Sequence, residues 1–198
     1  MESKYDKILS AEESFAREVA LGVSITKPLT VWHYLIPGMF IIDFLKRGSA
    51  IKRYSHHFMF PRKLALDAAQ TITQGEQKSQ RLLEAEQEIK TWLNALNLYS
   101  EGLLRIQMTT VDLLVDHYER LLKAEGESYY SLIENAYTNR VNYEAFLSRL
   151  TSAENEVDQA IIETLGETEN LRVRLAAEKA QVEKQRKKHI DRAFSWTG

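Results

Sequence analysis

Histidines and carboxylates are the side chains here that could do chemistry, because the sequence contains no cysteine. A carboxylate-bridged two-metal centre in a helical bundle needs Glu-x-x-His on two helices, and no histidine of this chain has a glutamate three positions before it. The His-Glu-x-x-His zinc motif and the glycine-rich phosphate-binding motifs are also absent. The sequence therefore predicts no catalytic residue, no metal site, no cofactor and no enzymatic activity. The histidines are His33, His56, His57, His117 and His189.

One acidic pair lies beside a histidine. Asp112 and Asp116 are one helical turn apart, and His117 follows directly. This group could hold a metal weakly, or it could form a buried polar contact that fixes the register of packed helices; we favour the polar contact. His56 and His57 are adjacent, so on a helix their rings point about 100° apart and cannot share a metal without further ligands.

The elements that must position these residues are predicted to be helices. Hydrophobic residues make up 44% of the chain and charged residues 27%, which suits a folded domain rather than a disordered one. All three prolines lie in the first third, so little interrupts a helix afterwards. From Arg62 onward, apolar residues recur largely at the a and d positions of heptads. We predict an all-α fold.

Residues 62–198 are predicted to form a long antiparallel, coiled-coil-like helical hairpin. An outgoing arm, 62–123, and a return arm, 128–192, have nearly equal lengths, and Gly126 followed by Ser128 suits a chain reversal near 124–128. Each arm would run about 90 Å at 1.5 Å per residue if it were unbroken.

Four residues within the predicted arms bear on where those arms break. Gly75 and Gly102 in the outgoing arm are interpreted as tolerated defects or local kinks, each costing about 1 kcal/mol relative to alanine. Gly166 and Thr168 in the return arm mark a break and a restart of the helix.

Residues 1–61 are predicted to be a separate helical region. An amphipathic helix over 4–23 comes first. An apolar stretch, 29–45, follows, and Pro37 and Gly38 interrupt its middle. Because proline kinks a helix and glycine permits a turn, this stretch is predicted to be a Pro-Gly-broken pair of short apolar helices.

Stretch 29–45 has two interpretations. Aromatic residues at its start and basic residues after its end are typical of a headgroup boundary, which predicts an in-plane or re-entrant membrane anchor. Asp43 would then pair with Lys46 or Arg47, because an unpaired carboxylate in hydrocarbon is costly. Alternatively, the stretch is the buried floor of a soluble helical domain.

Charge segregation supports the membrane interpretation. Positive residues dominate between 27 and 63 and again between 184 and 192, and the body between them is acidic. Antiparallel arms would bring both basic groups to one pole, where anionic lipid is the expected partner. The acidic body offers no continuous groove for nucleic acid. The predicted membrane-docking residues are Trp32, Tyr34, Phe40, Phe44, Lys46, Arg47, Lys52, Arg53, Lys187, Lys188 and Trp196.

Two functional hypotheses follow from these features. The first is a membrane-associated adaptor or scaffold in the cytoplasm, at the inner face of the cell membrane, because the N-terminus lacks the pattern of a signal peptide. Tyr129 and Tyr130 lie just beyond the reversal, where packing in the core is the commoner use of tyrosines; if they are exposed, they would form an aromatic tip that binds a protein partner. The second hypothesis is a soluble helical bundle, folded back at Gly75 and Gly102, that associates with itself or with a partner.

Overall fold

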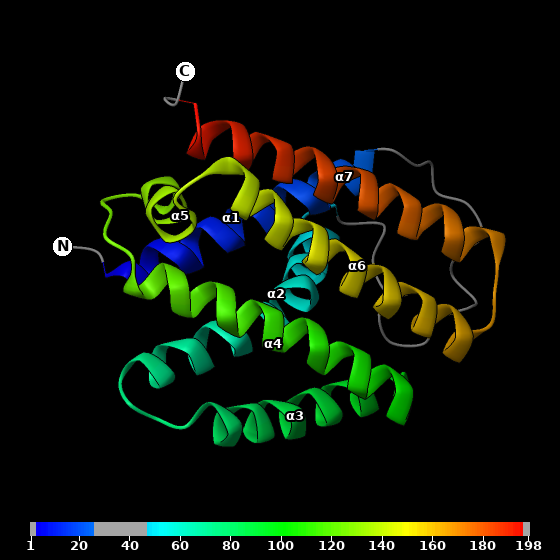
Figure 1. Ribbon diagram of the computed structural model, residues 1–198. Coiled ribbons are helices and arrows are strands. Elements are labelled where there is room, and N and C mark those ends of the chain that lie inside the picture. The colour runs from blue at the N-terminus through cyan, green and yellow to red at the C-terminus, as the bar shows by residue number, and fades with distance from the viewer. Residues whose placement is uncertain (1–2, 26–46, 196–198) are drawn as a thin grey trace.

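The computed structural model describes residues 3–25 and 47–195, and every regular element within them is a helix. This confirms the predicted all-α class (Figure 1). In chain order the helices are α1 (Lys4–Ile25), α2 (Arg47–Thr73), α3 (Lys78–Ala95), α4 (Glu101–Lys123), α5 (Tyr129–Tyr137), α6 (Arg140–Leu165) and α7 (Glu169–Ala193).

The outgoing arm is three helices rather than one. After α2, Gly75 has a φ of 106°, a backbone conformation that favours glycine. After α3, Asn97 has a φ of 55°, and Ser100 caps α4 by accepting a hydrogen bond from the Leu103 amide. The prediction of an unbroken outgoing arm is therefore wrong. The fold-back at Gly75 that the soluble-bundle hypothesis included is present, whereas the second fold-back lies near Asn97 and Gly102 is inside α4.

The return arm is also divided, in part where the sequence indicates. Ser128 caps α5 through a capping box with Ser131, as its position after the reversal suggests. Gly166, with a φ of 82°, ends α6, and Thr168 caps α7 by accepting from the Leu171 amide. These cap and break assignments are confirmed. The short α5 and the turn after it were not predicted, so two arms of about 90 Å are not formed.

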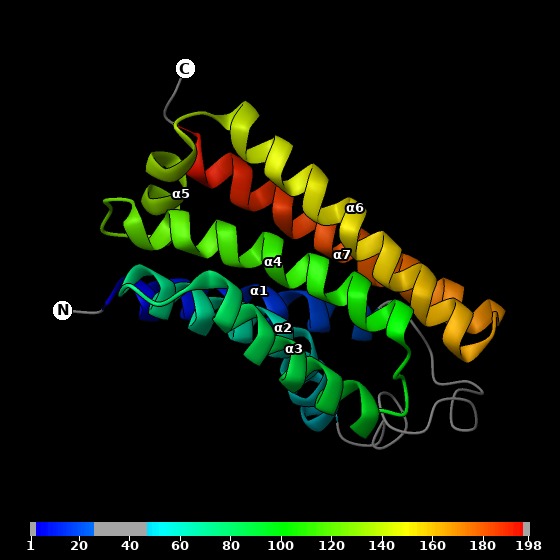
Figure 2. The same cartoon turned by 60° about the horizontal axis from the view of Figure 1, so that its bottom comes forward.

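α4 is the central helix of the bundle. It packs on α2, α3, α5 and α6, and Figure 2 shows it between the α6–α7 pair and the layer of α2 and α3. Its inward face buries Leu103, Val111, Leu114, Tyr118 and Leu121. The apolar faces of six other helices therefore close around one continuous core.

The α1 and α2 helices pack as an antiparallel pair. Their contacts run in opposite order along the two helices: the Tyr5 hydroxyl binds Asp67, Glu12 binds Arg62, and Phe15 stacks near Phe58. The C-terminal end of α1 and the N-terminal end of α2 therefore lie at the same end of the pair. We call this the open end.

The boundary predicted between residues 61 and 62 falls inside α2, which continues through Pro61. Ile8 from the first predicted region shares the main core with Ala65, Leu114 and Leu150 from the second. The described residues of both regions therefore belong to one packed body.

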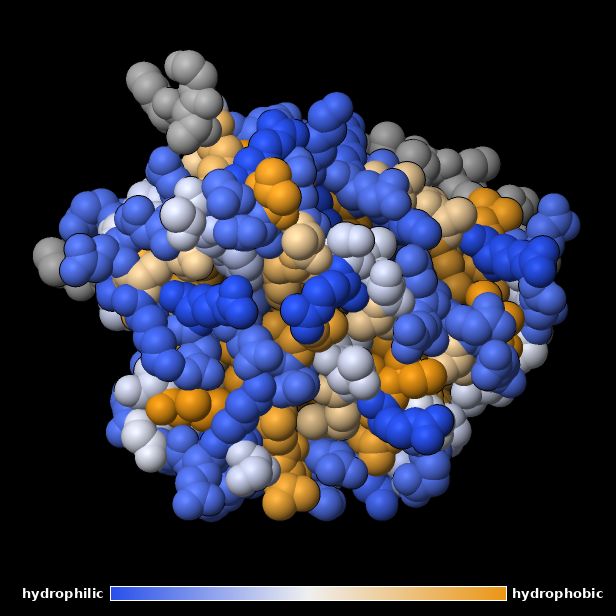
Figure 3. All heavy atoms as spheres, viewed as in Figure 1, coloured by the Kyte–Doolittle hydropathy of each residue, from blue (hydrophilic) through white to orange (hydrophobic). Residues whose placement is uncertain are grey.

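The stretch 29–45, with its Pro37-Gly38 break, lies outside the described residues. Within the described residues, no helix combines the length and the apolar character needed to cross a membrane. On the face in Figure 3, hydrophobic residues appear as small groups among hydrophilic ones.

Candidate functional site

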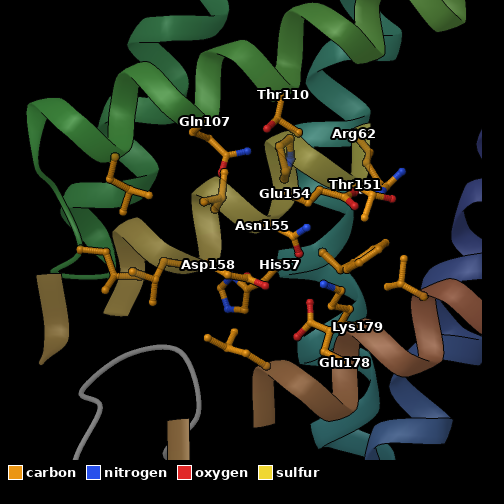
Figure 4. A pocket seen from close by; sticks show the side chains of 18 of the residues that line it. His57, Arg62, Gln107, Thr110, Thr151, Glu154, Asn155, Asp158, Glu178 and Lys179 are labelled. Carbon is orange, nitrogen blue, oxygen red and sulfur yellow. The ribbon is translucent and has the colours of Figure 1, made fainter. Parts of the chain in front are cut away.

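A cavity of about 190 Å³ lies between helices of the bundle. Five helices, α2, α3, α4, α6 and α7, contribute to its wall. Much of that wall is apolar, and Figure 4 shows that polar side chains of α2, α4, α6 and α7 occupy the rest. Bundle interiors of this kind are where helical proteins place ligands and cofactors.

Part of the polar wall is a buried ion-pair network that joins four helices. Arg62 on α2 binds Glu12 on α1 at 3.2 Å and Glu154 on α6 at 2.9 Å. Arg186 on α7 binds the second carboxylate oxygen of Glu154, Oε2, at 2.8 Å and donates to the Thr151 hydroxyl at 2.6 Å. Burial opposes the charge of Arg62, but Glu12 and Glu154 outweigh burial, so the pKa of Arg62 is raised. The two guanidinium groups are thus already neutralised.

The rest of the polar wall includes neutral side chains, the cation Lys179 and two carboxyl groups of raised pKa, Asp158 and Glu178. Burial, together with the charges of Glu178 and Glu154, raises the pKa of Asp158 to about 7, although Lys179 opposes this. Burial also raises the pKa of Glu178, against the opposing effects of the nearby Tyr54 hydroxyl and the charge of Arg174. Two carboxyl groups on α6 and α7 therefore hold protons more tightly than usual at one side of the cavity.

Two nitrogens of the same wall lack partners. The Nδ1 of His57 and the indole Nε1 of Trp92 are buried and have no hydrogen-bond partner in the described part of the chain. Burial is the main reason that the pKa of His57 is lowered. Unsatisfied buried polar atoms are uncommon in native proteins, and they often mark a place where water or a ligand binds.

Comparison with known proteins assigns this chain to no family. The sequence matches no protein-family model, and neither the curated proteins nor the solved structures contain a significant match. Function is therefore argued from the site alone.

The structure divides the group of Asp112, Asp116 and His117 between two environments. Both carboxylates lie near the surface, where they bind Lys78 of α3 at 2.7 and 2.5 Å. His117 points into the core, and burial lowers its pKa to about 3. Asp112 and Asp116 therefore form a surface contact with Lys78, and His117 forms a separate buried contact with Tyr137. Among the described residues, no cluster of three or more histidine and carboxylate side chains could hold a metal ion.

His117 is held as a neutral ring. Its Nδ1 lies 2.8 Å from the hydroxyl of Tyr137, whose pKa is raised mainly by burial. The ring stacks on Phe146 with a centroid distance of 4.4 Å. Both groups are neutral, so one of them donates to the other, and the tautomer of His117 determines which.

The predicted aromatic tip is only partly exposed. Tyr129 is 8% exposed and belongs to the main core, so it is not part of an exposed tip. Tyr130 is half-buried, and its hydroxyl accepts a hydrogen bond from Arg192 at 3.0 Å. Helix α7 packs against α5 and covers these rings. In a two-armed hairpin the rings would lie at the exposed turn.

The predicted docking residues fall into three groups. Lys52 is exposed and Arg53 half-buried near the start of α2, where Arg47 begins the helix. Lys187 and Lys188 are exposed on α7, and Lys188 binds Glu18 of α1 at 3.3 Å. The remaining docking residues lie outside the described part of the chain: Trp32, Tyr34, Phe40, Phe44, Lys46 and Trp196.

The two described basic groups do not meet at one pole as predicted. Tyr54, next to Arg53, lies beside Glu178 of α7. Lys188 is ten positions farther along that helix, which corresponds to between two and three helical turns at about 3.6 residues per turn. The lysine pair therefore lies nearer the middle of α1, away from the open end.

Sequence reasoning missed the cavity and its charged wall. The wall residues Arg62, Glu154, Asp158, Glu178 and Arg186 are spread over three helices, and nothing in their local spacing indicates that they meet. One available signal was Arg62, a charged residue between aromatic Phe60 and apolar Leu64 on a helix. Such a residue has to be paired when its helix packs into a core.

Proposed function

We propose that this protein is a non-enzymatic helical adaptor or scaffold that docks on a membrane surface through the open end of the α1–α2 pair. The observation that carries the proposal is the antiparallel packing of these helices, which brings Ile25 and Arg47 to the same end.

The connection between these two helices is unusually long and apolar in sequence. Helices in bundles are normally joined by about two to eight residues. Here residues 26–46 make the connection, and they include the apolar stretch 29–45 with Trp32, Tyr34, Phe40 and Phe44. A membrane interface accepts such residues, because aromatic rings and apolar side chains partition into it.

The packing of α1 on α2 favours contact with one leaflet over a single crossing. A single crossing by 29–45 would place α1 and α2 on opposite sides of the bilayer, whereas Glu12 and Arg62 join them in one core. An in-plane or re-entrant contact keeps both helices on one side. Lys46 and Lys52 would then attract anionic headgroups at the inner face of the cell membrane.

Vesicle flotation of the full chain tests this proposal. We expect the protein to float with phosphatidylcholine vesicles and to float more strongly when they contain phosphatidylserine. Phe40→Ser with Phe44→Ser should abolish flotation with both, and Lys46→Glu with Lys52→Glu should remove the preference for phosphatidylserine.

Lys187→Glu with Lys188→Glu is the matched control, because it makes the same charge change away from the open end. It should leave flotation nearly unchanged. A full chain that has the expected helical circular dichroism but stays with the lipid-free fraction would contradict the proposal. It would favour the soluble interaction module instead, in which the bundle holds a protein partner or a second copy without lipid.

A further inference from the structure

The cavity between α2, α3, α4, α6 and α7 is large enough for a small organic molecule, and much of its wall is apolar. Its volume of about 190 Å³ is many times the ~10–15 Å³ that one water molecule needs. Water alone would leave the apolar part of the wall in contact with solvent, which is unfavourable. A ligand of about seven non-hydrogen atoms with a hydrocarbon part would cover it. The apolar side chains include Leu103, Leu114, Val157, Ile161 and Leu175.

The charges of the wall determine which end group such a ligand would carry. Arg62 and Arg186 could bind an anion, but Glu12 and Glu154 already neutralise them. Asp158, by contrast, makes no ion pair within the part of the chain that the structure describes. Lys179 on the same wall and Arg174 beside Glu178 offset these carboxyl groups only in part, because the pKa of both Asp158 and Glu178 is still raised. An anionic ligand would meet these carboxyl groups, whereas a cationic ligand would add to the partial compensation.

We propose that the cavity binds a small amphipathic amine, with its ammonium group between the carboxyl groups of Asp158 and Glu178 and its hydrocarbon part against the apolar wall. The side chains of both residues line the cavity, from neighbouring helices α6 and α7 (Figure 4). An ammonium group supplies three hydrogen-bond donors and one positive charge, so it satisfies both carboxylates at once. The apolar wall holds the hydrocarbon part through burial.

Three linear compounds of equal length separate charge from hydrophobicity: n-hexylamine, n-hexanol and n-hexanoate. Each is titrated into the full chain by calorimetry at pH 8 without lipid, where Asp158 is largely ionised. We expect n-hexylamine to bind about tenfold more tightly than n-hexanol, because charge-assisted hydrogen bonds form only with the amine. n-Hexanoate should bind most weakly.

Variants locate the binding. Asp158→Asn with Glu178→Gln should reduce n-hexylamine affinity about tenfold, to that of n-hexanol. Glu156→Gln, on the exposed side of α6, makes the same chemical change and should leave affinity unchanged. Val157→Phe narrows the cavity and should weaken binding of both compounds.

Three results would overturn the proposal. The first is that n-hexylamine and n-hexanol bind with equal affinity. The second is that the protein with both Asp158→Asn and Glu178→Gln binds n-hexylamine as tightly as the natural chain. The third is that none of the three compounds binds at concentrations up to 10 mM. Circular dichroism checks that each variant is folded. Because lipid is absent, failure here leaves the flotation result unaffected, and failure of flotation leaves this result unaffected.

Discussion

At the scale of single residues, Asp158 shows how the bundle interior changes an ordinary carboxyl group. Two other carboxyl groups, Glu154 and Glu178, lie near it, and Lys179 only partly compensates them. The folded protein therefore keeps a proton on Asp158 that the unfolded chain releases near pH 3.9. Such a group lowers stability at neutral pH unless something positive binds beside it.

Asp158→Asn tests this effect through the pH dependence of stability. Between pH 4 and about 7 the folded state binds more protons at this site than the unfolded state, so the free energy of unfolding falls as pH rises through that range. Asparagine cannot ionise, so the variant should equal the natural chain near pH 4 and exceed it by about 1–2 kcal/mol at pH 8, after allowance for partial solvent access.

Urea titration at several pH values measures this difference, with Glu156→Gln as the control. A constant difference between the Asp158→Asn protein and the natural chain from pH 4 to pH 8 would show that Asp158 titrates normally. An Asp158→Asn protein that is less stable at pH 8 would show that the carboxylate has a counter-charge in solution.

At the scale of elements, the network of Glu12, Arg62, Glu154 and Arg186 fixes how four helices meet. It joins α1 to α2, α2 to α6 and α6 to α7, and Arg62 also lies over the Phe58 ring at 4.6 Å. Buried ion pairs of this kind need not raise stability, but removing one partner leaves an uncompensated buried charge.

Arg62→Met should therefore lower the free energy of unfolding by about 3–5 kcal/mol, because Glu12 would remain buried without its partner. Adding Glu12→Gln should restore part of the loss by removing that charge. Chemical denaturation measures both.

Lys63→Met is the matched control for this test, because it removes a neighbouring positive charge that is exposed and forms an ion pair with Asp67 one turn away. It should cost no more than about 0.5 kcal/mol. Equal losses for Arg62→Met and Lys63→Met would mean that the network does not bind these helices together.

The helical class of the elements was predictable, but their lengths were less so. Heptad periodicity predicted the helices, Ser128 predicted a helix cap, and Gly166 with Thr168 predicted a break between helices. These predictions succeeded because each signal is local in the sequence. The break at Gly75 was included only in the soluble-bundle hypothesis, and the break near Asn97 was placed at Gly102, since a heptad pattern continues across a turn whenever the next helix packs on the same core. Membership of the charged network depends on tertiary packing, which local spacing does not encode.

At the scale of the whole molecule, the outgoing and return arms are folded back on themselves, and α4 runs through the middle (Figures 1 and 2). This arrangement buries the aromatic side chain of Tyr129 and covers the Tyr130 ring with α7. It also leaves the open end of α1 and α2 as the place where the apolar sequence is attached.

Small-angle scattering distinguishes this shape from the extended hairpin. A compact chain of 198 residues should have a radius of gyration of about 16–17 Å. A hairpin with arms of about 90 Å would give a clearly larger value and a rod-like profile. Measurement at several protein concentrations checks for self-association, and a rod-like profile at the lowest concentration would contradict the folded-back arrangement.

The packing of the first helix on the last described one also matters for synthesis of the protein. Phe15 and Val19 on α1 form a hydrophobic cluster with Val182 on α7. At roughly 5–20 residues per second, about 10 to 30 seconds of translation separate these residues. During that time the nascent α1 has an uncovered apolar face, and stretch 29–45 has already been made. A ribosome-bound chain stopped before α7 should therefore be a target for chaperones or for a lipid surface.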